Sequence, residues 1–272
     1  MTDEAELLEI GRMAREMAAL AGAEMAAGLR RQPAVRYKAA PSGGESLRDP
    51  VSEVDETVEV MIRERLAARF PHHDVLGEEL AGRPAPESRF LWAIDPVDGT
   101  ANYINGFPLF AGSVGVLHDG VPIAGAVWCA ASHALGPGVY HAVRGGGLMF
   151  EGEALQPRVN PDVRRRLAGF VDASPRSASG WEPRRTGSAA IECAFVAAGL
   201  LEVARFERPN LWDVAGGFAL VEAAGGAVLQ QTDDGWQPFR TFLEEGRDPG
   251  SWRRPVLIGT REAVERLASS GA

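Results

Sequence analysis

Cysteine is scarce in this chain of 272 residues, which contains only Cys129 and Cys193. The two lie far apart and neither belongs to a Cys-x-x-Cys pair, so we expect two buried thiols in a reducing compartment. The chain also lacks an apolar run long enough to span a bilayer. Acidic residues stand at its start, where a secretory signal would carry basic ones. These absences predict a cytoplasmic protein without a membrane anchor.

Positive charge is also in short supply. Lys and Arg number 28 against 37 Asp and Glu, which gives a formal net charge of −9. Because nucleic-acid backbones and anionic membrane surfaces are bound by basic patches, this balance argues against both as partners. Hydrophobic residues at 45% and charged residues at 24% are ordinary for a globular protein. The length allows one large domain or two smaller ones.

Helical periodicity dominates the first quarter of the chain. A helix is expected from about Glu4 to Leu29, because large apolar residues recur there at three- to five-residue steps. The stretch Pro41-Ser42-Gly43-Gly44 breaks this pattern and is expected to be a mobile loop. A second helix is predicted to start near Asp55 and to end at Pro71.

Strand patterns follow. Asp74–Gly77 is predicted to be a short strand, and the apolar run Phe90–Ile94 a buried strand that leads directly to Asp95. Phe110–Leu117 and Val121–Trp128 indicate a hairpin. A third strand is expected at 139–143.

Beyond residue 161, strand-like and helical segments alternate, which indicates an α/β arrangement with a partly parallel sheet. We therefore expect an α+β domain over residues 1–145 and an α/β domain over residues 146–272. The segments are strands at 167–171, 202–206 and 256–258, and helices at 188–198 and 213–224.

Four acidic elements each lie at the end of an apolar segment or at the start of a helix: Asp55, Glu78 with Glu79, Asp95 with Asp98, and Asp213. Taken singly, Asp55 and Asp213 could be helix caps, and the two glutamates a solvated turn. A carboxylate at the mouth of a buried strand is costly unless it is paired or bound to a cation. Together these acids offer Mg²⁺ the hard oxygen ligands that it prefers.

The run Asp-Pro-Val-Asp-Gly-Thr at residues 95–100 gives each residue type a physical use. Its two aspartates, three apart on a turn that the proline stiffens, can face the same ions. The valine offers a backbone carbonyl as another hard ligand. Gly99 lets the backbone approach a phosphate closely, and the amides of Gly99 and Thr100 stand at an expected helix N-terminus, where anions bind.

Five segments carry a family resemblance: Asp49–Asp55, Gly77-Glu78-Glu79, Asp95–Tyr103, Thr186-Gly187-Ser188-Ala189-Ala190 and Trp212–Gly217. Over residues 49 to 226 they resemble, in the expected order, the motifs of the inositol monophosphatase family. The resemblance implies a layered αβαβα sandwich of the α+β and α/β type, usually a homodimer. It places most of the metal ligands in the first half of the chain.

The resemblance implies two or three Mg²⁺ ions, for which Mn²⁺ can substitute. Glu78, Asp95 and the carbonyl of Val97 would hold the first. Asp95, Asp98 and Asp213 would hold the second.

Catalytic roles are implied for Asp55, Glu78, Asp98 and Thr100. Glu78 would share a weaker third ion with help from Asp55. Thr100, in contact with Asp55, would orient the attacking water and accept its proton. The phosphate would rest on the amides of Gly99 and Thr100 during in-line attack, without a covalent intermediate.

Substrate contacts are implied at the turn of residues 95–100, called the phosphate turn below, at the substrate loop of residues 186–190, and near the Trp-Asp motif of residues 212–213. They are Gly99, Thr100, Gly187, Ser188, Ala189, Glu207 and Asp213. The assignment of Glu207 as the sugar-ring contact stays open, because a gap-free alignment places Phe206 there. Asn210 and Arg208 are alternative polyol contacts.

We therefore predict a Mg²⁺-dependent phosphomonoesterase acting on a small polyol phosphate, with inositol monophosphate as the first choice. Histidinol-phosphate phosphatase and fructose-1,6-bisphosphatase are alternative enzymes, and a catalytically silent metal-binding regulatory subunit is the alternative of another class. Glu79 either supports a bound water or amide, or is simply solvated. Arg184-Arg185 either meets a second substrate charge or is a solvated pair. Lithium sensitivity is a family property that the sequence does not show.

Overall fold

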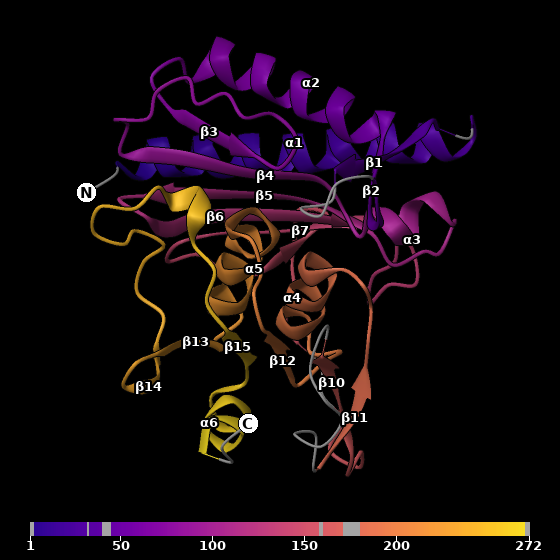
Figure 1. The fold of residues 1–272 in the computed structure, drawn as a ribbon. Helices are drawn as coiled ribbons and strands as arrows, with labels where there is room; N and C mark the ends of the chain where they lie inside the picture. The colour runs from indigo at the N-terminus through magenta and orange to yellow at the C-terminus, as the bar shows by residue number, and fades with distance from the viewer. Residues whose placement is uncertain (1–2, 32, 40–44, 158–159, 171–179, 270–272) are drawn as a thin grey trace.

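The computed structural model describes residues 3–31, 33–39, 45–157, 160–170 and 180–269. Its helices and sheets stack in five layers: helix, sheet, helix, sheet, helix (Figure 1). The predicted αβαβα sandwich is confirmed. The loop predicted at residues 41–44 lies outside the described ranges.

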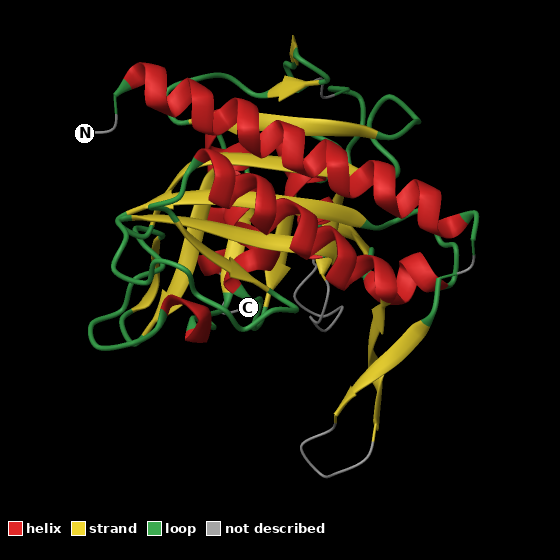
Figure 2. Cartoon of the chain, turned by 90° about the horizontal axis from the view of Figure 1, so that it is seen from above, coloured by secondary structure: helices red, strands yellow, loops and turns green. Residues whose placement is uncertain are grey.

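The first layer contains α1 (Glu4–Leu29), as predicted, and α2 (Glu53–Arg69). The two helices lie side by side across the first sheet (Figure 2). The second helix begins two residues before Asp55, because Ser52 caps it. The Ser52 hydroxyl accepts a hydrogen bond from the Val54 amide at 3.2 Å, and the Asp55 carboxylate accepts one from the Ser52 amide at 3.0 Å. This capping box places Asp55 in the first turn, not at the N-cap.

Before α2, the strands β1 (Val35–Ala39) and β2 (Glu45–Ser52) form an antiparallel pair that extends away from the body of the protein (Figure 2). The second layer is a seven-stranded sheet in the order β3-β4-β5-β6-β7-β8-β9. Its strands are β3 (Asp74–Gly77), β4 (Phe90–Asp98), β5 (Ala111–His118), β6 (Val121–Cys129), β7 (Gly138–Val143), β8 (Met149–Phe150) and β9 (Glu153–Ala154). The predicted hairpin is confirmed, with each strand displaced by at most one residue.

One prediction about this sheet is wrong: β4 does not end at Ile94 but continues to Asp98. The two aspartates of the phosphate turn therefore belong to the strand. Asp95 pairs with Ser113 and Asp98 with Ala111, so three steps on β4 oppose two on β5. This irregularity has the character of a β-bulge, which redirects side chains at the end of a strand.

The second sheet has six strands in the order β11-β10-β12-β15-β13-β14. It is partly parallel, as predicted: β10 runs parallel to β11 and β12, whereas β15 is antiparallel to β12. The strands are β10 (Arg166–Phe170), β11 (Trp181–Arg184), β12 (Val203–Phe206), β13 (Ala227–Thr232), β14 (Gly235–Pro238) and β15 (Val256–Gly259), the last preceded by the 3-10 helix η2 (Pro249–Ser251). A division into two domains near residue 145 stays a prediction.

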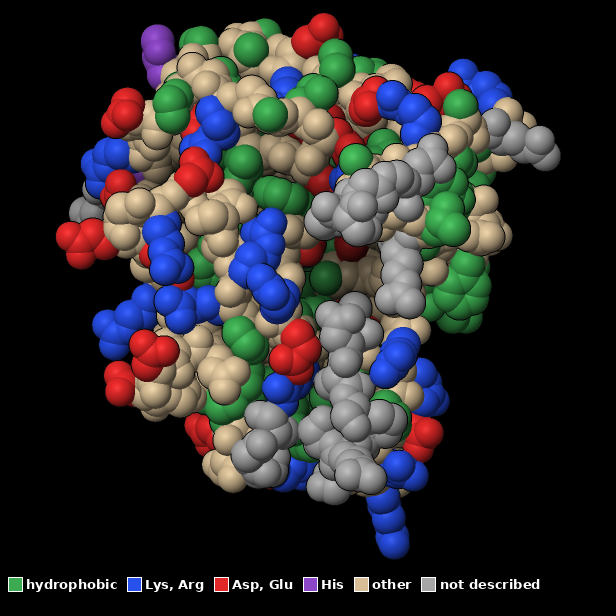
Figure 3. Space-filling model, viewed as in Figure 1, with side chains coloured by type: hydrophobic (Ala, Val, Ile, Leu, Met, Phe, Trp, Pro, Cys, Tyr) green, Lys and Arg blue, Asp and Glu red, His purple; other side chains and the backbone are tan. Residues whose placement is uncertain are grey.

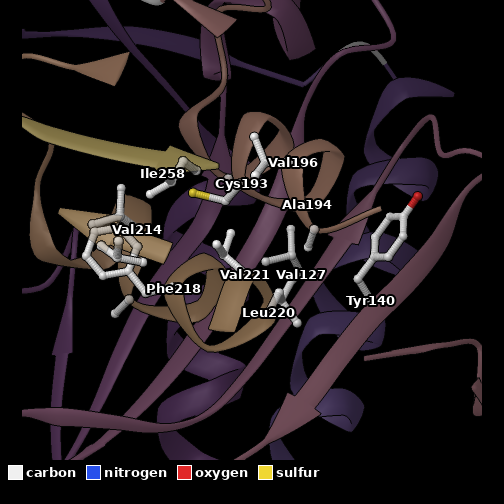
Figure 4. Packing of buried hydrophobic residues seen from close by; sticks show 14 of the residues in the cluster. Val127, Tyr140, Cys193, Ala194, Val196, Val214, Phe218, Leu220, Val221 and Ile258 are labelled. Atoms are coloured by element: carbon white, nitrogen blue, oxygen red, sulfur yellow. The ribbon is translucent and has the colours of Figure 1, made fainter. Parts of the chain in front are cut away.

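Between the sheets lie α4 (Ala189–Ala197) and α5 (Leu211–Ala223), and α6 (Arg261–Ser269) covers the outer face of the second sheet. Apolar side chains from both sheets and both inner helices meet in one core, with Val127 from the first sheet and Ile258 from the second (Figure 4). In the described part of the chain, no helix combines the length and apolar character needed to cross a membrane.

Gly216 and Gly217 allow α5 to pack closely against its neighbours. A Cβ on Gly217 would lie 2.2 Å from the Cβ of Cys193 on α4, and a Cβ on Gly125 of β6 would lie 2.1 Å from the Gly216 carbonyl oxygen. The backbone of α5 therefore rests directly on the first sheet. Both Cys193 and Cys129 are buried free thiols, as expected.

Candidate active site

Asp55 and Thr100 meet where α2 and α3 (Thr100–Ile104) begin. The Thr100 hydroxyl oxygen lies 3.2 Å from Asp55 Oδ1 and 2.9 Å from the carbonyl oxygen of Val97. A hydroxyl has one proton to donate, so these two acceptors compete for it. The other Asp55 oxygen accepts the Ser52 amide at 3.0 Å, which fixes the carboxylate in place.

Asp95 and Asp98 lie at the end of β4, and both are buried. Asp95 Oδ1 accepts a hydrogen bond from the amide of Val97 at 3.1 Å. Asp98 accepts one from the Ala190 amide at 2.6 Å and another from the Ser188 hydroxyl, both at the start of α4. The structure thus joins the phosphate turn to the predicted substrate loop.

Asn102 makes a second connection to that loop, which sequence reasoning missed although it quoted the residue in a motif. Its Nδ2 donates to the carbonyls of Leu109 at 2.6 Å and Thr186 at 2.7 Å. Gly187 follows with φ +78°, a conformation that favours glycine, and a Cβ there would approach Asn102 Nδ2 to 3.0 Å. Asn102 therefore sets the distance between the two loops.

Asp213 lies in the first turn of α5, where it accepts hydrogen bonds from the Asn210 amide at 2.7 Å and from Asn210 Nδ2 at 3.1 Å. Asn210 is the N-cap and Asp213 completes its capping box. A capping role for Asp213 is therefore compatible with the proposed role as a metal ligand. Apart from Glu207, the predicted residues thus lie at the ends of β3 and β4 and at the starts of α2, α3, α4 and α5. Helix N-termini favour negative charge, which stabilises such a cluster of acids.

Glu207 is not brought to this cluster by its contacts in the described part of the chain. Its Oε1 lies 2.6 Å from Arg205 Nε on β12. The Arg205 guanidinium in turn lies 5.7 Å from the ring centroid of Trp236 on β14. These contacts direct Glu207 toward the second sheet. Arg208 is exposed.

Glu78 and Glu79 do not form a solvated turn, since their side chains are only 23% and 6% exposed. Lys38 Nζ lies 2.8 Å from Glu78 Oε1 and 3.0 Å from Glu79 Oε1. Burial lowers the pKa of Lys38, but the two carboxylates, Glu78 first, raise it well above its usual value. Lys38 is a residue that sequence reasoning missed, because nothing in the local pattern of its strand distinguishes it.

Burial raises the pKa of five carboxyl groups, and the charge of Glu78 raises each further: to about 6 for Asp55 and Asp98, about 7 for Glu79, about 8 for Asp213, and well above the ordinary range for Asp95. The six acids therefore share one electrostatic environment. On the face of the molecule seen in Figure 3, acidic side chains are visible in a hollow, beside Lys and Arg side chains.

The acids are turned toward donors of the chain itself: Lys38, Ser188 and Asn210. Accordingly, within the described ranges no three His, Cys, Asp or Glu side chains are placed to ligate one ion together. The Arg184-Arg185 pair is exposed, with Arg184 Nη1 3.6 Å from Glu182 Oε1.

Comparison with known proteins agrees with this architecture. A fructose-1,6-bisphosphatase/inositol-1-monophosphatase of Aquifex aeolicus is 35% identical over 193 residues, covering 66% of this chain and 71% of that protein. A probable inositol 1-monophosphatase, ImpA, of Mycobacterium tuberculosis is 36% identical over 207 residues, covering 70% and 74%. The solved inositol monophosphatase of Anabaena shares the fold, with TM-score 0.74, 24% identity and coverage of 97% and 95%. The model of the inositol monophosphatase family matches residues 6–269. The chain therefore belongs to the inositol monophosphatase family, a family of phosphoric monoester hydrolases.

Proposed function

We propose that this chain is a Mg²⁺-dependent phosphomonoesterase that hydrolyses a small polyol phosphate, with inositol monophosphate as the first candidate. One observation carries the proposal: Asp95 and Asp98 are buried at the end of β4, and Asp55 of α2 lies against Thr100 just after them. The charge of Glu78, which raises the pKa of every other acid of the group, supports it. Such mutual repulsion in a buried site is relieved by bound cations.

The donor set fits magnesium. Every predicted ligand atom is a hard oxygen, as Mg²⁺ requires. We assign Glu78, Asp95 and the Val97 carbonyl to one ion, and Asp95, Asp98 and Asp213 to another. When bound, these ions offset the charge of the phosphate and lower the pKa of a bound water. Glu78 must exchange its contact with Lys38 to take this role.

Thr100 and Asp55 form the proton path. An attacking water that donates to the Thr100 hydroxyl lets Thr100 pass its own proton to Asp55, 3.2 Å away. Of the two acceptors beside Thr100, only the carboxylate can take up a proton. Burial, opposed by the Ser52 hydrogen bonds, raises the pKa of Asp55 to about 6, which suits a proton acceptor near neutral pH.

The phosphate is held by backbone. Gly99 adopts φ +84° as the N-cap of α3, a conformation that favours glycine, and the first amides of a helix are a favourable place for an anion. Asn102 and the start of α4 fix the opposite wall. The chain thus supplies position and electrostatics, as phosphoryl transfer requires.

A sugar bisphosphate is the second candidate substrate, because Arg253 lies within electrostatic reach of Asp213 and of a second arginine, Arg208. The Arg253 guanidinium lies 5.3 Å from the ring centroid of Trp212. Burial lowers the pKa of Arg253, Asp213 raises it and Arg208 lowers it. A relative named as both a fructose-1,6-bisphosphatase and an inositol-1-monophosphatase supports the same alternative.

The test is phosphate release by the purified protein with Mg²⁺ from inositol 1-phosphate, histidinol phosphate and fructose 1,6-bisphosphate, with EDTA as the metal-free control. We expect turnover of at least one ester that EDTA abolishes. Absence of turnover with all three would contradict the enzyme proposal and favour a silent regulatory subunit. We also propose a homodimer, which light scattering in solution would test.

A further inference from the structure

Behind the Glu78-Glu79 turn, α2 carries a buried ion pair that the proposed chemistry does not use. Glu59 is fully buried, and the side chain of Arg63 is 16% exposed. Arg63 Nε lies 2.8 Å from Glu59 Oε1, at the i, i+4 spacing of one helix turn. A buried carboxylate is tolerated only when its oxygens are satisfied, so the partners of Glu59 indicate what the pair is for.

Those partners are backbone groups of the turn that carries the candidate ligand. Glu59 Oε2 accepts the amide of Glu79 at 2.8 Å, and Oε1 accepts the amide of Leu80 at 3.3 Å. Arg63 donates to the carbonyls of Leu80 at 2.8 Å and Gly82 at 2.7 Å. Donors and acceptors of residues 79–82 are therefore fixed from one side by a single pair of charged side chains.

Gly77 shows how close this contact is. A Cβ on Gly77 would lie 2.1 Å from Glu59 Oε1, so the chain passes directly over the carboxylate just before Glu78. The same helix holds Asp55 one turn earlier, where Asp55 contacts Thr100. Through α2, the backbone of the Glu78 turn is thus held at a fixed distance from the proton path.

We propose that Glu59 and Arg63 are positioning residues: they fix the backbone of residues 79–82 and so hold the Glu78 carboxylate where it binds a divalent cation. This inference rests on the proposed function. It assigns a role in metal affinity to two residues that touch neither the ion nor the substrate. Partners of this kind typically change metal affinity by about 10- to 100-fold when they are altered.

The test uses Glu59→Gln and Arg63→Gln, with Mn²⁺ as the probe. In Glu59→Gln the new NH₂ group faces an amide donor, and in Arg63→Gln the fork that joins two carbonyls is lost. The matched controls are Glu64→Gln and Arg65→Gln, which change exposed neighbours on the same helix. Free Mn²⁺ is measured by electron paramagnetic resonance, and folding by circular dichroism.

We expect Mn²⁺ to bind about 10- to 100-fold more weakly to both variants and unchanged to both controls. A positioning role further predicts that saturating Mn²⁺ restores kcat to within a few-fold, while the Mn²⁺ concentration for half-activation rises. Arg63→Lys, which keeps the charge but loses the fork, should give an intermediate affinity.

Wild-type Mn²⁺ affinity in the folded variants would overturn the inference. Should Glu59→Gln fail to fold, Arg63→Gln decides by the same criterion. If the wild type binds Mn²⁺ but hydrolyses no phosphate ester, the proposed function fails, and the comparison of Mn²⁺ affinities still decides whether the pair positions Glu78.

Discussion

The Lys38 ammonium lies 2.8 Å from the Glu78 carboxylate, so a side chain from the β1–β2 pair places a positive charge on a candidate metal ligand. Because the neighbouring carboxylates raise the pKa of Lys38 well above its usual value, this charge persists across the accessible pH range. A divalent cation must therefore compete with Lys38 for Glu78.

Removing the Lys38 charge is expected to tighten metal binding. Lys38→Met should increase Mn²⁺ affinity several-fold, because like charges then no longer share the site. Mn²⁺ titration measures this effect. Arg36→Met, an exposed change on the same strand, is the control. Weaker Mn²⁺ binding in Lys38→Met would instead mean that Lys38 orders Glu78.

Asp98→Asn should reduce kcat/KM by a factor on the order of 10³. The Asp98 carboxylate accepts a hydrogen bond from the start of α4, and we propose that it is a ligand of one Mg²⁺ ion. We expect the variant to fold, because the amide oxygen can still accept the Ala190 amide. Kinetics and thermal unfolding are measured together, with the exposed Asp233→Asn as the control. A folded variant with most of its activity would show that the assignment of Asp98 is wrong.

Gly217→Ala should lower the free energy of unfolding by about 1–3 kcal/mol, because the added methyl would overlap Cys193 of α4. Urea unfolding measures the change. Gly136→Ala is the matched control, since a Cβ there meets nothing within 4 Å. An equal effect at both positions would mean that helix contact does not explain the requirement for glycine.

The contribution of His73 to stability should fall as the pH drops from about 6.5 to about 4. Burial first, and then the charge of His72, lower the pKa of His73 to about 4 from an ordinary 6.5. Between these values His73 binds more protons in the unfolded state than in the folded state, so its contribution to the free energy of unfolding rises with pH. Neutral His73 accepts the Trp92 indole proton at 3.1 Å and stacks against Phe90 at 4.3 Å between ring centroids.

Urea unfolding at several pH values tests this effect. In His73→Phe the slope of the free energy of unfolding against pH should decrease between pH 4 and 6.5, whereas the exposed His72→Phe should change this slope much less. The carboxylates of the site titrate in both proteins, so the difference between variants isolates His73. An unchanged slope in His73→Phe would contradict the assignment.

The sequence predicts well those features that depend on the residues of one segment alone. The bounds of α1 follow from its apolar period, and the motif acids stand where a helix or strand delivers them. The extension of β4 to Asp98 depended on Ser113 and Ala111 of the neighbouring strand, which no local pattern of β4 contains. Lys38 is 40 residues from Glu78 in sequence. Glu59 and Arg63 have the spacing of an ordinary solvated helix pair, so their burial left no local signal.

The contact between α5 and the first sheet has one more consequence. Where Gly125 meets the carbonyl of Gly216, no side chain separates α5 from the first sheet. A change in side-chain packing therefore cannot compensate for a shift of the helix against the sheet. Asp213 belongs to the helix, whereas Asp95 and Asp98 belong to the sheet. The distance between the two halves of the candidate metal site is therefore set by a direct backbone contact. A larger residue at Gly125 or Gly216 would increase that distance.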